Sequence, residues 1–233
     1  MEDSERSFAD ITGKATLIKE SAEGFVPPFN SPNPDDAPLI FGAYIDSCIN
    51  KNAEIGNVRQ DYTTGSVDRK EIVKDVKTRA LRSMTNVKSV VAYKPYAKGL
   101  EITYRKLRNY KVPGAKKPDP DEKKRNKGEQ SFADIANLFK TFIAGLTAIV
   151  GYTHLDVSLQ LPALNALYTK LHNKNIAMAE LSASENRLTP ERRDMFYNKT
   201  TGLKARMLSV KDAVKNQYGP DSPEYLSVKS IRV

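Results

Sequence analysis

The sequence has few of the residues that covalent cross-links and common chemical sites require. Its 233 residues include one cysteine and two histidines. A single cysteine, Cys48, excludes an intramolecular disulfide, which agrees with a reducing compartment. We therefore expect Cys48 to be a small core residue.

Long hydrophobic runs are also missing. The best candidate, residues 142–152, is shorter than the roughly 18 consecutive apolar residues that cross a bilayer, and it contains one threonine and two glycines. The first ten residues are acidic, whereas a secretory signal begins with basic residues followed by an apolar run. The sequence therefore predicts a cytoplasmic location and no membrane partner.

The motifs of familiar enzyme chemistry do not occur in the sequence. A dimetal site in a helical bundle needs a glutamate three residues before each histidine, but Gly151 precedes His154 and Thr169 precedes His172 at that spacing. There is no glycine-rich phosphate loop, no Cys-x-x-Cys and no Gly-x-Ser-x-Gly. We predict a non-enzymatic protein without a cofactor, a metal ion or catalytic residues.

What the sequence does contain is a repeated segment. SFADI occurs at residues 7–11 and again at residues 131–135, at an offset of 124 positions. Asn-Lys-Asn follows at residues 50–52 and 173–175, at an offset of 123. Insertions and deletions in loops produce such a drift, and the matches predict two copies of one unit.

The matches divide the chain into four parts. Residues 1–6 form an N-terminal arm, residues 7–112 the first helical repeat, residues 113–130 a linker, and residues 131–233 the second helical repeat. The linker is charged and contains proline and glycine, a composition typical of flexible connections. We refer to the two repeats as the first and second copy.

Apolar spacing predicts three helices in each copy. The first helix has an apolar stripe with alternating spacings of three and four residues, and the stripe is matched between the copies. It consists of Phe132, Ile135, Phe139, Phe142, Leu146 and Ile149 in the second copy, and of Phe8, Ile11, Ala15, Ile18, Ala22 and Phe25 in the first. The second helix carries Leu164, Leu167, Leu171, Met178 and Leu181, and in the first copy Phe41, Tyr44, Cys48, Ile55 and Val58.

The third helix is predicted from its capping residues. In the second copy Thr189 is a suitable cap and Pro190 suits the first helical position, while Ser66 is the expected cap in the first copy. Gly219 and the prolines that follow it are expected to end this helix. The terminal segment then reads as too short and too β-branched for a stable helix.

Together these patterns predict an all-α fold. The expected architecture is an up-and-down helical bundle built from two tandem three-helix repeats, each followed by a short extended tail. The tails are residues 104–112 and 225–233. We further expect the two first helices to meet and to merge the copies into one six-helix body.

Three stretches of the sequence carry a resemblance to a known group. They are SFADIANLFKTFIAGL, LPALNALYTKLHNKN and NKTTGLKARMLSVKDAVKNQYGPDSPEYLSVKSIRV. They resemble an uncharacterised family of bacterial all-helical bundle proteins, most clearly over residues 131–233. The first copy departs from the pattern, since KGLEITY replaces the Ser-Pro-Glu-Tyr turn. The resemblance implies a helical fold and no particular activity.

The net charge of +9 is unevenly distributed along the sequence. Residues 1–63 carry five lysines and arginines against eleven aspartates and glutamates, whereas residues 94–112 carry six against one. Acidic and basic surfaces on one chain favour contacts between chains, and a basic segment with interleaved tyrosines is typical of a nucleic-acid groove.

Two hypotheses of function follow. The leading one is a structural or interaction protein that self-associates, as a homo-oligomer or a filament, through charge-complementary surfaces and terminal segments. Its candidate assembly contacts are Tyr225, Val228, Ile231 and Val233.

The alternative is a polyanion-binding module, with nucleic acid as the possible partner. Its candidate contacts are Lys94, Lys98, Arg105, Lys106, Arg108 and Lys111. The tyrosines of this segment either stack on bases or pack inside the protein.

Overall fold

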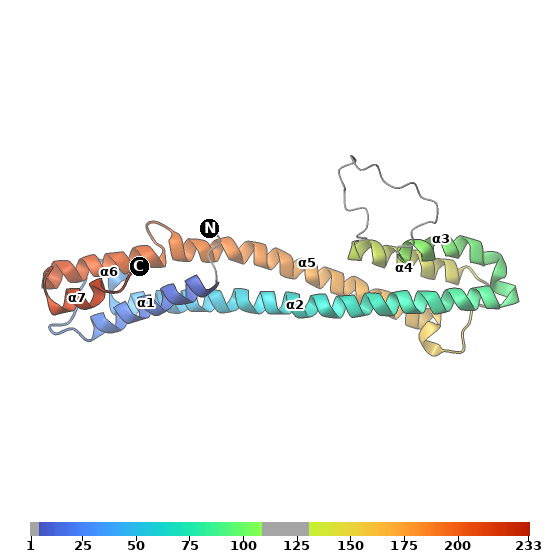
Figure 1. The fold of residues 1–233 in the computed structure, drawn as a ribbon, viewed down its shortest axis with the longest axis horizontal. Coiled ribbons are helices and arrows are strands. Elements are labelled where there is room, and N and C mark those ends of the chain that lie inside the picture. The colour runs from blue at the N-terminus through green and yellow to red at the C-terminus, as the bar shows by residue number, and fades with distance from the viewer. Residues whose placement is uncertain (1–4, 109–130) are drawn as a thin grey trace, which may run out of the picture. The chain divides into compact units, whose positions relative to one another are not determined.

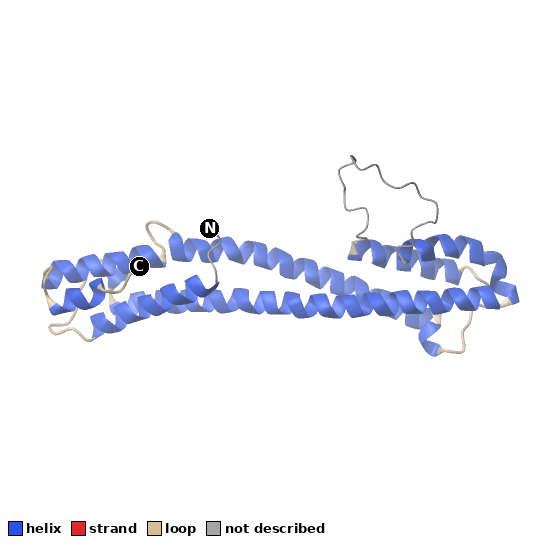
Figure 2. Ribbon diagram, in the orientation of Figure 1, coloured by secondary structure: helices blue, strands red, loops and turns tan. Residues whose placement is uncertain are grey.

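The computed structural model describes residues 5–108 and 131–233, which form helices and connecting loops (Figure 1). In chain order the helices are α1 (Glu5–Glu23), α2 (Pro38–Ser89), α3 (Ala97–Leu107), α4 (Phe132–Thr147), α5 (Leu161–Tyr197), α6 (Leu203–Tyr218) and α7 (Pro223–Lys229). Short 3-10 helices in the described ranges connect them, namely η1 (Pro34–Asp36), η2 (Val91–Tyr96) and η3 (Val157–Leu159). No strand occurs in these two ranges (Figure 2), so the prediction of an all-α helical bundle is confirmed.

Two of the predicted segments fall partly or wholly outside the described residues. The predicted linker, residues 113–130, lies outside them, and so do the first four residues of the predicted N-terminal arm. Helix α1 begins at Glu5, so it starts before the predicted first copy. Within the described part of the chain, no helix is both long enough and apolar enough to cross a membrane.

The chain divides into two compact units. Unit 1 contains residues 1–61 and 181–233, and unit 2 contains residues 62–180. Helices α2 and α5 each contribute one part to unit 1 and the other part to unit 2. The compact units therefore do not coincide with the predicted copies, because each unit takes residues from both.

In unit 1, α1 packs against α6 and α7 (Figure 1). The predicted apolar stripe of α1 faces this contact, and five of its six side chains are buried. The core also contains side chains from α2, α5, α6 and α7, among them Phe41, Cys48, Phe196, Met207, Val210 and Val228. Phe8 meets Phe196 edge to face, with 4.8 Å between the ring centroids.

In unit 2, α4 packs against α3. The SFADI sequence determines where α4 begins, since Ser131 Oγ accepts a hydrogen bond from the Asp134 amide at 3.0 Å and Asp134 Oδ2 accepts one from the Ser131 amide at 3.1 Å. This is a capping box, which satisfies amides that the first turn leaves without partners. The stripe residues from Ile135 to Ile149 are buried in the core of unit 2.

The two first helices do not form one shared core. Helix α1 contributes to the core of unit 1 and α4 contributes to the core of unit 2. The prediction of a single six-helix body is therefore wrong. Each first helix finds its apolar partner in the last helices of the other copy, which the order of the sequence does not reveal.

The predicted extended tails are also wrong where the structure describes them. Residues 223–229 form α7, and Tyr104 lies in α3. Ser222 caps α7 by accepting a hydrogen bond from the Tyr225 amide at 3.1 Å, and Pro223 occupies the first turn. Val228 is fully buried, so packing outweighs the β propensity of this short segment.

The predicted starts of the third helices are wrong, because both positions lie inside longer helices. Helix α2 runs through Ser66 without a break, and α5 continues through Pro190 to Tyr197. Gly65 lies against α5, where an added Cβ would approach Met178 Sδ to 2.5 Å, so the glycine permits close packing and does not end the helix. The real interruption is at residues 198–202, where Asn198 Oδ1 accepts hydrogen bonds from the amides of Thr200 and Thr201.

Candidate polyanion-binding surface

A basic groove lies in unit 2 beside α2 and the end of α3. Its volume is about 470 Å³. The groove is lined by Lys70, Val73, Lys74, Lys77, Thr78, Leu81 and Arg108. No carboxylate contributes to this lining, which is composed of described residues alone.

The three lysines share one face of α2 because of their spacing. Lys70, Lys74 and Lys77 are separated by four and three residues, which places them in one row along a helix. At a rise of about 1.5 Å per residue the row extends roughly 10 Å. This length is sufficient for several phosphate groups of one nucleic-acid strand, which are spaced by roughly 3.4 Å along the axis of a duplex.

Arg108 is held at its position in the groove by Tyr104. Arg108 Nη1 donates a hydrogen bond to Tyr104 Oη at 3.0 Å, and the guanidinium carbon lies 5.8 Å from the centre of the tyrosine ring. The tyrosine is buried in the core of unit 2, with 8% of its surface exposed. The guanidinium is therefore fixed by a rigid neighbour while it remains exposed to solvent.

The ion pairs along this face are weak. Lys74 Nζ lies 3.7 Å from Glu71 Oε2, and both side chains are more than two-thirds exposed. Exposed pairs of this kind contribute about 0–1 kcal/mol, because water screens both charges. Lys74 can therefore exchange this partner for a phosphate at little cost.

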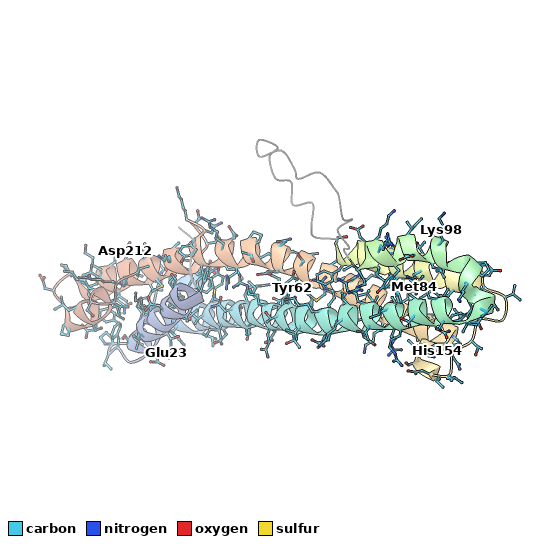
Figure 3. All side chains as sticks on the ribbon, turned by 45° about the vertical axis from the view of Figure 1, so that its right-hand side comes forward. Glu23, Tyr62, Met84, Lys98, His154 and Asp212 are labelled. Carbon is cyan, nitrogen blue, oxygen red and sulfur yellow. The ribbon has the colours of Figure 1, made fainter. Side chains whose placement is uncertain are left out.

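The described basic residues that the sequence grouped together lie on η2, α3 and the residue after α3, and only Arg108 among them lines the basic groove. Lys94 lies in η2, and Lys98 projects from α3 (Figure 3). Arg105 is exposed and donates a hydrogen bond to Glu101 at 3.0 Å, and Lys106 is exposed on the same helix. Arg108 lines the groove and Lys111 lies outside the described residues.

Two tyrosines of the basic segment, Tyr93 and Tyr104, pack inside unit 2, whereas Tyr96 is 40% exposed. Tyr93 is 7% exposed and its hydroxyl donates a hydrogen bond to the Gly151 carbonyl at 2.8 Å. Tyr104 lies 6.5 Å from Phe142 between ring centroids. Of the two interpretations left open by the sequence, packing is the one that holds for Tyr93 and Tyr104, and neither ring is available to stack on a base.

The net positive charge of the chain lies in unit 2. Counted over the sequence, this unit has 22 lysines and arginines against 11 aspartates and glutamates, whereas unit 1 has 15 against 17. The acidic N-terminal region belongs to unit 1, where it finds cationic partners: Arg206 Nη2 lies 3.5 Å from Asp35 Oδ2. The excess positive charge of the chain is therefore an attribute of unit 2.

A second groove in unit 2 has mixed charge. It lies between α2 and α5 and has a volume of about 770 Å³. Asp68, Glu71 and Asp75 line one side, with Lys170 and Lys174 on the other. Because Lys174 Nζ already lies 2.9 Å from Asp68 Oδ2, this groove is less suited to a polyanion than the basic groove.

The predicted assembly contacts lie at the end of the chain, in unit 1. Val228 is fully buried, and Tyr225 and Ile231 pack partly buried against the same core. Lys211 Nζ donates a hydrogen bond to the Ile231 carbonyl, and burial lowers the pKa of this lysine from its ordinary value. Val233 is 38% exposed. Contact with another chain through Val228 therefore requires α7 to leave this position.

The histidines and carboxylates form no recognisable chemical centre in the described residues. His154 Nδ1 accepts a hydrogen bond from the Asp156 amide at 2.9 Å, which makes it part of the loop before η3. The ring of His172 stacks on Tyr168 with 5.8 Å between centroids. Among the residues described, no group of three or more histidine, cysteine, aspartate or glutamate side chains is placed to hold a metal ion.

Comparison of the chain with protein-family models, with curated proteins and with solved structures finds no significant match. The resemblance to bacterial all-helical bundle proteins therefore stays a prediction.

Proposed function

We propose that this chain is a non-enzymatic protein that binds polyanions, nucleic acid among them, through the basic groove of unit 2. The observation that carries the proposal is the convergence of Lys70, Lys74, Lys77 and Arg108 on one groove, with no carboxylate among the described residues that line it. Neutralising phosphates with such residues releases condensed counterions, which provides most of the affinity of sequence-independent binding.

The chemistry of the groove favours contacts to the phosphate backbone. Lysine is a compact point charge that recognises a phosphate without orienting it, and among the described residues of the lining Arg108 alone has a guanidinium. Because Tyr93 and Tyr104 are buried, base stacking has no support from these two rings. The binding expected is therefore independent of base sequence and strongly dependent on salt.

The test compares a groove variant with a matched variant of unit 1. Lys74→Glu/Lys77→Glu reverses two charges in the groove, and Arg193→Glu/Lys199→Glu reverses two exposed charges in unit 1. Binding to a fluorescent duplex is measured by anisotropy over a series of salt concentrations. The groove variant should lose affinity and reduce the salt slope by about one for each lysine, while the control keeps the slope of the wild type. Equal losses in both variants, or no binding by the wild type at low salt, would contradict the proposal.

We also propose that residues 7–112 and 131–233 are copies of one unit. Each begins with a SFADI helix that is followed by a 3-10 helix and a long helix. The 3-10 helices are capped alike, since Asn33 accepts a hydrogen bond from the amide two residues later and Asp156, 123 positions further on, does the same. Such agreement in both order and capping supports a duplication.

Self-association, the leading hypothesis from the sequence, is our second proposal. Apolar side chains are exposed in unit 1, with Val26 at 83% and Leu39 at 85%. Contact with another chain would remove such side chains from water, which is favourable for apolar surface. The mass of the particle in solution, measured by sedimentation over a range of concentrations, tests this second proposal. We also propose a cytoplasmic location and a bacterial origin.

A further inference from the structure

Contacts between the two copies occur in reciprocal pairs. In unit 1, Lys51 Nζ of α2 lies 3.2 Å from Glu191 Oε2 of α5. In unit 2, Lys174 Nζ of α5 lies 2.9 Å from Asp68 Oδ2 of α2. Lys174 is 123 positions after Lys51, and Glu191 is 123 positions after Asp68. The first copy therefore contributes the lysine, Lys51, to the ion pair in unit 1 and the carboxylate, Asp68, to the ion pair in unit 2.

A second pair of contacts follows the same rule. The guanidinium of Arg192 lies 4.0 Å from the ring centre of Phe8, and that of Arg69 lies 3.7 Å from the ring centre of Phe132. The arginines are 123 positions apart and the phenylalanines 124, as the two SFADI segments require. Each first helix is therefore held by an arginine of the other copy, through a cation–π contact.

The packing of whole helices agrees with the side chains. In unit 1, α1 of the first copy contacts α6 and α7 of the second. In unit 2, α4 of the second copy contacts α3 of the first. Each unit is thus closed by helices from both copies, and neither core consists of residues from one copy alone.

These pairs have the form of a two-fold interface. When one surface binds an identical surface, residue i of the first contacts residue j of the second, and j of the first contacts i of the second. Lys51, Asp68 and their equivalents satisfy this relation, and so do the arginines and phenylalanines.

We infer that each copy presents a self-complementary surface whose partner is another copy of the same repeat. The chain is in this sense a dimer of repeats joined by a linker. The inference goes beyond polyanion binding and does not depend on it, because none of the reciprocal contacts involves a residue that lines the basic groove. It also gives self-association a specific partner, since a repeat from a second chain offers the same surface.

The test cuts the full-length protein within the predicted linker. A protease site is inserted between residues 113 and 130, and the purified protein is cleaved and analysed by size exclusion and native mass spectrometry. The two pieces should stay together as one particle with the mass of the uncut chain. The last melting transition, at which the two pieces separate, should move to lower temperature on dilution, because association has become bimolecular. Separation of the pieces at micromolar concentration, whether or not they remain helical, would overturn the inference.

Charge reversal tests which residues make the surface. In the cleaved protein, Lys51→Glu/Lys174→Glu should weaken association on the order of tenfold, since two pairs between the copies become repulsive. Adding Asp68→Lys/Glu191→Lys should restore most of the loss.

The matched control is Lys14→Glu, because the ion pair of this lysine with Asp10, at 2.7 Å, lies within α1. It should leave association of the pieces unchanged. A loss of equal size in the control, or a failure of the charge-swapped variant to recover, would remove these residues from the surface.

Discussion

At the scale of single residues, burial controls the chemistry of the one cysteine. Cys48 lies fully buried in the core of unit 1, and this burial raises the pKa of its thiol to about 12. The reactive form of cysteine is the thiolate, so a buried thiol with such a pKa is inert in the folded protein. It becomes a reporter for the opening of unit 1.

We predict that Cys48 reacts with a thiol reagent at pH 8 only when unit 1 unfolds. The folded pKa is raised above the unfolded value, so the contribution of this group to stability is complete below about pH 9 and is lost as the pH rises toward 12. The rate of labelling, measured with and without denaturant, checks the first statement, and unfolding at pH 8 and pH 10 checks the second. Rapid labelling of the native protein would contradict the buried position.

The SFADI helices differ most where Phe139 in α4 corresponds to Ala15 in α1, and both are fully buried. Phe139→Ala should lower the free energy of unfolding of unit 2 by about 3–5 kcal/mol, because the side chain leaves a cavity in the core. Chemical denaturation measures the change. Leu155→Ala, at a fully exposed position, should stay within about 0.5 kcal/mol of the wild type. A comparable loss in both variants would argue against the described core.

At the scale of helices, apolar periodicity was a better guide than local capping signals. The stripes on the first and second helices were predicted from spacing, and their side chains are buried or partly buried. The predicted helix starts near Ser66 and Thr189 were wrong. Gly65 lies inside α2 and Pro190 lies inside α5, and both helices continue beyond these residues. Local residue types indicate where a helix could end, and tertiary contacts determine whether the helix ends there.

The candidate site also combines residues that are far apart in the sequence, which a single segment of sequence does not reveal. The basic segment was found as residues 94–112, but only Arg108 of its described members lines the groove. Lys70, Lys74 and Lys77 were missed because they lie in another helix, and the packing of α2 with α3 brings the two segments together. Their spacing of four and three residues was the one signal available in the sequence.

The terminal helix α7 provides a prediction at this scale. Truncation after Ser222 should lower the thermal stability of unit 1, because it removes the buried Val228 together with Tyr225 and Ile231. Full burial of a side chain such as Val228 contributes about 1.5–3 kcal/mol. The measurements are thermal unfolding and the mass of the particle. Val233→Ser is the control, since this side chain is partly exposed.

The two outcomes of this truncation discriminate between modes of docking. If α7 packs on its own chain, the particle changes only by the mass of the removed residues. A full-length assembly that becomes a folded, helical monomer on truncation would instead place α7 on a neighbouring chain. That outcome would favour self-association through Tyr225, Val228, Ile231 and Val233.

At the scale of the whole molecule, the two units have separate cores and different charge. Unit 2 carries the positive excess and unit 1 is close to neutral. Both contain residues from each predicted copy, and the two separate cores carry surfaces of different charge. Polyanion binding in unit 2 is compatible with reciprocal contacts in both units, because the two use different residues.

Separate cores lead to a last prediction, that the units unfold as two cooperative steps. A cooperative unit is a region whose buried contacts form and break together, and each core here is contiguous by itself. Phe139→Ala should therefore lower the melting temperature of one calorimetric transition, and Phe41→Ala, which is equally buried in unit 1, should lower that of the other. Labelling of Cys48 assigns the transitions, since it follows unit 1 alone. A single transition that both variants shift by the same amount would show instead that α2 and α5 couple the two cores into one cooperative unit.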